Sequence, residues 1–145
     1  MRLCWFLIPY ACLALVFWGC ELKHNNPLDP ENNSSIQVPP QVLNLAASAS
    51  PHGAAAKFVR LIWSKNLSNT TGYYIYMGMA YNAQFVRVGE QGNISSDPGG
   101  QIIIWIKTDM VPGDYYFKVS AYKDFGDDGI LEGHLSNWVY IRVPN

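Results

Sequence analysis

Apolar and polar residues alternate in short runs along residues 40–145, and Gly, Pro, Asn and Asp separate the runs. An alternation with period two places successive side chains on opposite faces, which is typical of β-strands buried on one side. No run after the first twenty residues has helical spacing. We therefore expect seven strands, near residues 42–45, 59–63, 73–77, 85–88, 102–107, 115–121 and 139–143.

Seven short strands separated by turns predict an all-β fold of the immunoglobulin-like β-sandwich class. The run at residues 102–107 is unusual because Ile102, Ile103, Ile104, Trp105 and Ile106 are all apolar. Either parity could face the core there, or a bulge could shift the register. The remaining strands each have one clearly apolar face.

Several motifs follow these strands in a fixed order. Along the chain they are Pro39-Pro40 with Val42-x-x-Leu45, Trp63, Gly72-Tyr73-Tyr74-Ile75-Tyr76, the run from Met110 to Ala121 that contains Pro112-Gly113 and Tyr115, and Leu135-Ser136-Asn137-Trp138-Val139. Together they resemble a fibronectin type III domain over nearly all of residues 40–145. The resemblance implies that Trp63 fills the space between two sheets. It also implies that Tyr115 forms a tyrosine corner, with its ring in the core and its hydroxyl bonded to nearby backbone.

The N-terminus has the layout of an export signal, because Arg2 precedes an almost wholly apolar stretch that ends at Gly19. The Gly19-Cys20 junction resembles the lipobox of bacterial lipoproteins. That resemblance implies cleavage before Cys20, lipid attachment to its thiol, and a location in the cell envelope, anchored to a bacterial membrane. Two alternatives stay open: an uncleaved transmembrane anchor, at the short end of the roughly 17–25 residues that span a bilayer, and ordinary secretion.

Residues 21–40 are polar, rich in Asn and Pro, and lack apolar periodicity, which is typical of a flexible linker. We therefore divide the chain into a signal peptide (1–19), a lipidated Cys20 with a flexible tether (20–39), and a fibronectin type III-like domain (40–145). No cysteine follows Cys20, so the domain is expected to be stable by packing alone. The net charge of −1 and the absence of a basic run argue against a nucleic-acid partner.

The sequence offers no catalytic constellation, since His24, His52 and His134 are scattered and no nucleophile lies near a plausible base. We expect no enzyme activity, no cofactor and no metal site. An acidic loop begins at Asp124 and includes Asp127 and Asp128, between the last two expected strands. An EF-hand loop needs Asp or Asn at its third position and Glu at its twelfth. Gly126 and Leu135 occupy them here, so we interpret the segment as a turn-forming loop.

Strand alternation predicts an aromatic outer face on one sheet, with Lys118 and Arg142 as its cations. Its candidate binding residues are Tyr74, Tyr76, Tyr116, Tyr122, Trp138 and Tyr140. Such a face could bind sugar rings or a partner protein by stacking and apolar contact. Alternatively, its cross-strand aromatic and cation–π pairs could serve only to stabilise the sheet. The acidic loop is a second candidate binding site, because the corresponding loop is a common binding site in the family.

These features predict an extracytoplasmic binding module that is anchored to a membrane by lipid, adhesin-like or accessory, with a protein or glycan ligand. The alternative is a structural subunit of an envelope assembly complex. The sequence does not define the ligand or the oligomeric state.

Overall fold

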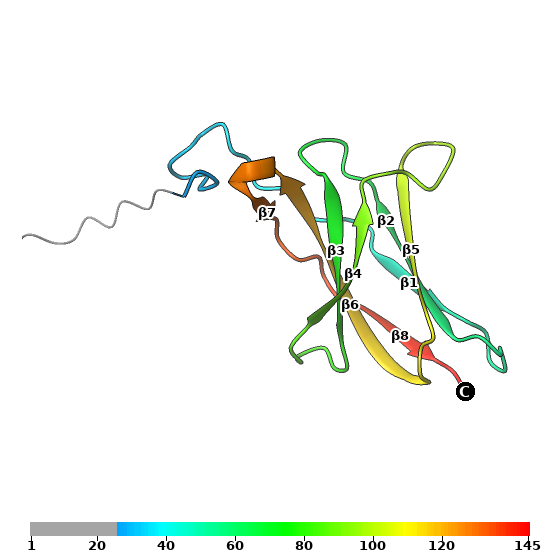
Figure 1. The fold of residues 1–145 in the computed structure, drawn as a ribbon. Helices are drawn as coiled ribbons and strands as arrows, with labels where there is room; N and C mark the ends of the chain where they lie inside the picture. The colour runs from blue at the N-terminus through cyan, green and yellow to red at the C-terminus, as the bar shows by residue number, and fades with distance from the viewer. Residues whose placement is uncertain (1–25) are drawn as a thin grey trace, which may run out of the picture.

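A computed structural model describes residues 26–145, which form a nearly all-β fold (Figure 1). The expected signal peptide, Cys20 and the first residues of the tether lie outside the described residues. Within residues 26–145, no helix is long and apolar enough to cross a membrane.

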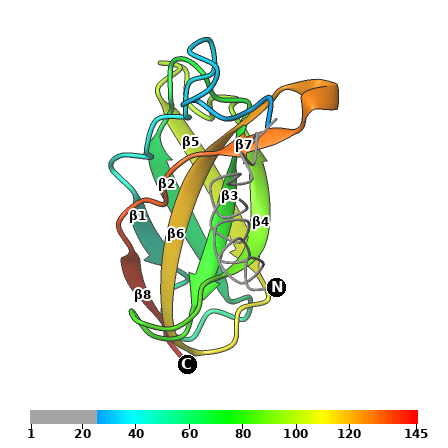
Figure 2. The same ribbon diagram turned by 90° about the vertical axis from the view of Figure 1, so that its left-hand side faces the viewer.

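The strands form two antiparallel sheets that pack face to face. The three-stranded sheet has the order β1-β2-β5 and comprises β1 (Ala46–Ala49), β2 (Phe58–Ser64) and β5 (Ile102–Thr108). The five-stranded sheet comprises β3 (Gly72–Gly78), β4 (Val86–Gly92), β6 (Gly113–Asp124), β7 (Ile130–Glu132) and β8 (Val139–Val143). In it, β4 pairs with β3, β3 pairs with β6, and β6 pairs with both β7 and β8. Figure 2 shows β8 beside the start of β6 and β7 near its end.

The predicted all-β sandwich is confirmed. The strand expected at residues 85–88 extends to Gly92 as β4, and two further differences concern β1 and β7. The first strand begins at Ala46 rather than near Val42, because Asn44 adopts a left-handed backbone (φ 57°) that interrupts the extended run. The sequence did not predict β7, which lies within the expected loop. This strand has only three residues, too few to show an alternation, and it forms by pairing with Tyr122–Asp124 of β6 after the short 3₁₀ helix η1 (Gly126–Asp128).

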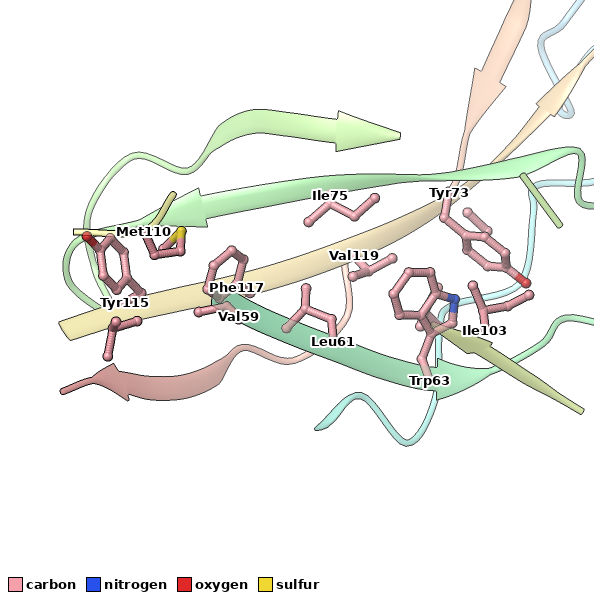
Figure 3. Packing of buried hydrophobic residues seen from close by; sticks show 13 residues of the cluster. Val59, Leu61, Trp63, Tyr73, Ile75, Ile103, Met110, Tyr115, Phe117 and Val119 are labelled. Atoms are coloured by element: carbon pink, nitrogen blue, oxygen red, sulfur yellow. The ribbon is translucent and has the colours of Figure 1, made fainter. Parts of the chain in front are cut away.

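The core lies between the two sheets, and alternate residues of facing strands fill it (Figure 3). Trp63 is 1% exposed and packs edge-on against Tyr73, with ring centroids 5.3 Å apart. The Tyr115 ring is buried, and its hydroxyl donates a hydrogen bond to the Val111 carbonyl at 2.8 Å. Both aromatic residues thus have the positions that the sequence led us to expect. All buried residues of this cluster lie between Val42 and Val143, so a fragment of residues 26–145 contains the whole core.

The structure shows which residues of the all-apolar strand β5 face the core. Its pairing with β2 runs without a shift, and Ile103 is fully buried between the sheets. Trp105 shares that parity and packs against the edge of the core beside Gly89 of β4. A Cβ on Gly89 would lie 2.5 Å from the Trp105 ring, so the close approach requires glycine there. Ile102, Ile104 and Ile106 consequently lie on the outer face.

The described part of the expected flexible tether lies against one end of the sandwich. Leu28 is 7% exposed and contacts the β6–β7 hairpin, where a Cβ on Gly129 would lie 3.6 Å from its side chain. Pro39 is also buried, and the Asn69 side chain donates to the Gln37 carbonyl at 2.6 Å. Figure 1 shows this segment beside η1, at the opposite end of the sandwich from the C-terminus.

Candidate functional site

The predicted aromatic face is the outer face of the five-stranded sheet. Register pairs Tyr76 with Lys118 and Tyr116 with Tyr140, while the neighbouring residues of these strands face the core. The structure separates the six candidate aromatic residues into two groups. We name Tyr74, Tyr76 and Tyr122 the closed group, and Tyr116, Trp138 and Tyr140 the open group.

The closed group is covered by its own members and by β4. Tyr74 stacks on Tyr122 with ring centroids 4.3 Å apart and an interplanar angle of 17°. The Arg87 guanidinium lies 3.4 Å above the centre of the Tyr74 ring, a cation–π contact. As a result, Tyr74 is 6% exposed and Tyr122 is 7% exposed. Gly72 makes room for this packing, because a Cβ there would lie 2.6 Å from the Tyr122 hydroxyl oxygen.

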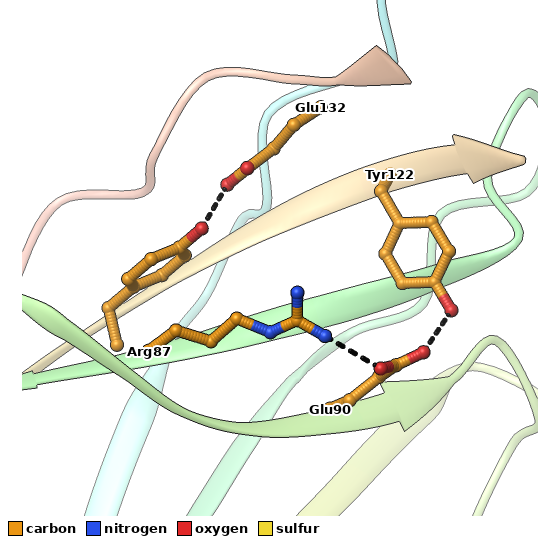
Figure 4. A network of polar contacts seen from close by, with 5 residues as sticks. Arg87, Glu90, Tyr122 and Glu132 are labelled. Carbon is orange, nitrogen blue, oxygen red and sulfur yellow. Dashed lines mark hydrogen bonds and ion pairs between the residues drawn. The ribbon is translucent and has the colours of Figure 1, made fainter. Parts of the chain in front are cut away.

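Two carboxylates satisfy the hydroxyls of the closed group (Figure 4). The Tyr122 hydroxyl donates to Glu90 at 2.5 Å, and Arg87 forms an ion pair with the same carboxylate at 2.8 Å. The Tyr76 hydroxyl donates to Glu132 at 2.7 Å.

Burial, followed by the hydrogen bond to Glu132, raises the pKa of Tyr76 to about 12. Burial and Glu90 likewise raise the pKa of Tyr122. These phenols are therefore held in their neutral, hydrogen-bonding form.

The sequence correctly predicted that Tyr74 and Tyr122 lie on the outer face, but the expectation that both are open for ligands is wrong. The sequence analysis did not identify Arg87 and Glu90, which contact Tyr74 and Tyr122. The register between β3 and β4 shifts at Ile75/Tyr76, which brings Arg87 opposite Tyr76. Simple alternation does not reveal such a bulge, although Arg and Glu three residues apart beside an aromatic strand are a usable signal.

The open group has aromatic surface that no other described residue covers. Trp138 and Tyr140 both lean on Tyr116, with ring centroids 5.4 Å and 5.3 Å from it and interplanar angles of 72° and 49°. Nevertheless, Trp138 remains 49% exposed and Tyr140 44% exposed. Tyr116 is half-buried beneath them. Two large rings are therefore held in place by a third while still facing solvent.

Polar groups border the open group. The Tyr140 hydroxyl donates to Asp114 at 2.7 Å, a hydrogen bond that, together with the nearby negative charge, raises the pKa of Tyr140. Arg142 lies 3.9 Å from the same carboxylate. On the other side, the Lys118 ammonium lies 4.6 Å above the Phe85 ring. An apolar centre with a charged border is the usual composition of a protein interaction surface.

The position of Trp138 depends on an interruption between β7 and β8. There the Ser136 backbone N–H donates to the Val119 carbonyl at 2.8 Å. The Ser136 hydroxyl in turn accepts a hydrogen bond from the Val119 N–H at 2.9 Å. The side chain of Ser136 thus replaces one backbone acceptor of the ladder, and β8 resumes directly after Trp138.

The candidate binding loop lies at the far end of β6. Asp124 accepts a hydrogen bond from the Gly126 N–H at 2.8 Å, and the Phe125 N–H donates to the Gly129 carbonyl, so the segment is a hairpin turn. Asp127 and Asp128 lie exposed in η1. Within residues 26–145, no group of three or more His, Cys, Asp or Glu residues could hold a metal ion. The candidate lipid-attachment residue, Cys20, lies outside the described residues.

No family model matches this chain, and no curated protein matches it.

Proposed function

We propose that this chain is a lipid-anchored, extracytoplasmic binding module of the bacterial cell envelope, and that residues 40–145 are a fibronectin type III-like domain. The two-sheet strand order and the hydrogen bond from the Tyr115 hydroxyl to Val111 support the domain assignment. The Gly19-Cys20 junction supports the lipid anchor. A module of this kind acts by contact, through a surface that it presents to a ligand.

The observation that carries the proposal is the exposure of Trp138 and Tyr140. A purely stabilising ladder gains most when its rings cover one another, as Tyr74 and Tyr122 do in the closed group. In the open group, Trp138 is still 49% exposed and Tyr140 44% exposed. Exposed aromatic clusters mark interaction sites, and Trp and Tyr are enriched among the residues that dominate binding energy. The ligand chemistry that fits is a flat apolar group, either a sugar ring or an apolar side chain of a partner protein.

The attachment of the N-terminal segment favours the open group over the acidic loop as the binding site. Leu28 and Pro39 hold that segment at the η1 end of the sandwich. Only six peptide bonds separate Asn26 from Cys20, so an acylated Cys20 would keep the η1 end within roughly 20 Å of the membrane surface. The acidic loop would then face the membrane. The open group lies about eight residues back along β6 and would face away from it.

The test compares variants of the fragment 26–145 in capture experiments. Trp138→Ala combined with Tyr140→Ala should lose the captured ligand. Ile94→Ala, which alters another exposed apolar residue, is the matched control and should retain it. Envelope proteins, identified by mass spectrometry, and purified envelope polysaccharides form two separate arms. If the double variant captures the same ligands as the unmodified fragment in both arms, the open group is not the binding site.

A further inference from the structure

A second surface, on the other sheet, is formed by the free edge of β5. Among residues 26–145, β5 pairs only with β2. The Ser96 N–H donates to the Ile102 carbonyl at 2.8 Å, and the Ile104 N–H donates to the Ser96 hydroxyl at 3.1 Å. The backbone groups of Ile102 and Ile104 therefore point away from β2. In an antiparallel pair this direction alternates, so Ile106 and Thr108 point outward as well.

Ser96 occupies only the first part of this edge. It satisfies the Ile102 carbonyl and the Ile104 N–H, much as a residue of a neighbouring strand would. Beyond it, five outward backbone groups have no neighbouring strand in the described part of the chain: the Ile104 carbonyl, the N–H and carbonyl of Ile106, and the N–H and carbonyl of Thr108. An exposed row of this kind is a template for pairing with another extended chain.

Four of these five groups are complementary to the same four groups on a second copy. In an antiparallel pair centred on Ile106, two copies of Ile106 exchange both of their hydrogen bonds. The Thr108 N–H of each copy then meets the Ile104 carbonyl of the other. Four of the five free groups on each chain are used. The fifth, the Thr108 carbonyl, faces the Ile104 N–H of the other copy, which already donates to the Ser96 hydroxyl. A two-fold arrangement of this kind is the commonest symmetry of homodimers.

We propose that β5 pairs with β5 of a second copy of this chain about a two-fold axis at Ile106, which joins the two three-stranded sheets into one continuous sheet of six strands.

The side chains of β5 fit this register. Ile106 is 53% exposed and would face its own copy across the axis, an apolar pair. Ile104 would lie opposite Thr108, and Lys107 opposite Trp105, so no two like charges are directly opposed. Four hydrogen bonds and a small apolar contact predict a weak dimer whose population depends on concentration.

Two other edge strands, β4 and β1, are less suited to pairing. On β4 the ladder contains a register shift, and the exposed charged residues Arg87 and Glu90 lie on the strand, two features that discourage edge-to-edge association. Elsewhere, β1 lies beside β8 of the other sheet. A strand of another protein could pair only with the free backbone groups between Ile104 and Thr108. A second copy of this chain offers the same short segment, with donors and acceptors in matching positions.

The test is a charge exchange at Ile106, measured by sedimentation equilibrium on the fragment 26–145 up to about millimolar concentration. The unmodified fragment should show a monomer–dimer equilibrium. Ile106→Lys and Ile106→Glu should each weaken dimerisation at least tenfold. An equimolar mixture of the Lys and Glu variants should restore dimerisation, because residue 106 of one copy lies opposite residue 106 of the other and the two charges then attract. Ile102→Lys is the matched control: it lies on the same face of the same strand but outside the paired window, and it should dimerise like the unmodified fragment.

A cysteine variant provides a second readout that does not depend on tolerance of a charge. The fragment 26–145 has no cysteine, so Ile106→Cys carries a single thiol. Directly opposite residues in a hydrogen-bonded antiparallel pair have Cα atoms about 5.5 Å apart, within disulfide range. Oxidation should link Ile106→Cys into dimers much faster than Ile102→Cys. A monomeric unmodified fragment, a charge mixture that stays monomeric, or equal cross-linking at the two positions would each overturn the proposal. The proposal would also be overturned if Ile106→Lys abolished binding of a different protein to β5 but left dimerisation unchanged.

Discussion

Trp138 lies edge-on against Tyr116, with ring centroids 5.4 Å apart, and still exposes about half of its surface. The two residues come from segments that only strand pairing brings together, since Tyr116 lies in β6 and Trp138 directly precedes β8. A ring that is held in one orientation loses little conformational freedom when a ligand covers it. This pair is therefore the centre of the proposed binding surface.

The core aromatic residues should differ in their contribution to stability. Trp63→Ala removes a fully buried ring between the sheets and should cost roughly 3–5 kcal/mol. Tyr115→Phe removes only the hydrogen bond to Val111 and should cost on the order of 1 kcal/mol. Urea melts of the fragment 26–145 measure both values. If Trp63→Ala were as stable as the unmodified fragment, the interpretation of this core would be wrong.

Alanine substitutions should also distinguish the closed group from the open group. Tyr74→Ala removes a buried ring that stacks on Tyr122 and lies under Arg87, so it should cost roughly 3 kcal/mol. Trp138→Ala removes a half-exposed ring at the border of the sheet and should cost about 1 kcal/mol or less. Denaturant melts of the two variants in parallel provide the measurement. If both variants lost the same free energy of unfolding, the closed and open groups would not differ in their contribution to stability.

The raised tyrosine pKa values predict a loss of stability at high pH. The pKa of Tyr76 is about 12 in the folded protein, compared with 10.0 for its ordinary value. Below pH 10 the phenol is protonated in both states, and its contribution to stability is complete. Between about pH 10 and 12 only the unfolded state loses the proton, so the free energy of unfolding falls.

Melts at pH 8, 10 and 11 test this dependence. Tyr76→Phe should show a shallower decrease than the unmodified fragment, because it lacks this ionisation while Tyr122 and the lysines still titrate. Identical pH profiles for the two proteins would contradict the role of Glu132 as an acceptor for the neutral phenol.

The anchor proposal predicts a specific chemical change at Cys20. In the full-length chain expressed in a bacterium, Cys20→Ser should abolish acylation and leave either an uncleaved precursor or released protein. Stable anchoring needs more than one acyl chain, because a single chain binds a membrane only marginally. Intact-mass analysis of the membrane fraction gives the answer. A mature N-terminus other than an acylated Cys20 would disprove the anchor.

Strand alternation was sufficient to predict the sandwich and its core, because each inward residue from Val59 to Trp63 belongs to one parity. The same rule placed the aromatic residues on the outer face. It did not predict their exposure, since Arg87 covers Tyr74 only through the register shift on β4. A pattern along one strand carries no information about a side chain that arrives from the neighbouring strand.

The N-terminal segment shows a second limit of sequence patterns. Leu28 is a single apolar residue among polar ones, so no periodicity marks it. Its burial depends on the β6–β7 hairpin, whose close approach is possible because Gly129 has no side chain. Contacts of this kind depend on tertiary structure and become visible only when both segments are in place.

The most direct test of the proposed function is the affinity of the fragment 26–145 for its captured ligand, measured before and after the change of Trp138 and Tyr140 to alanine. Aromatic residues that anchor an interface often contribute 2 kcal/mol or more, so we expect the dissociation constant to rise about thirtyfold or more. Denaturant melts of the same samples should show that the fold is retained. An unchanged dissociation constant in a folded double variant would contradict the central claim.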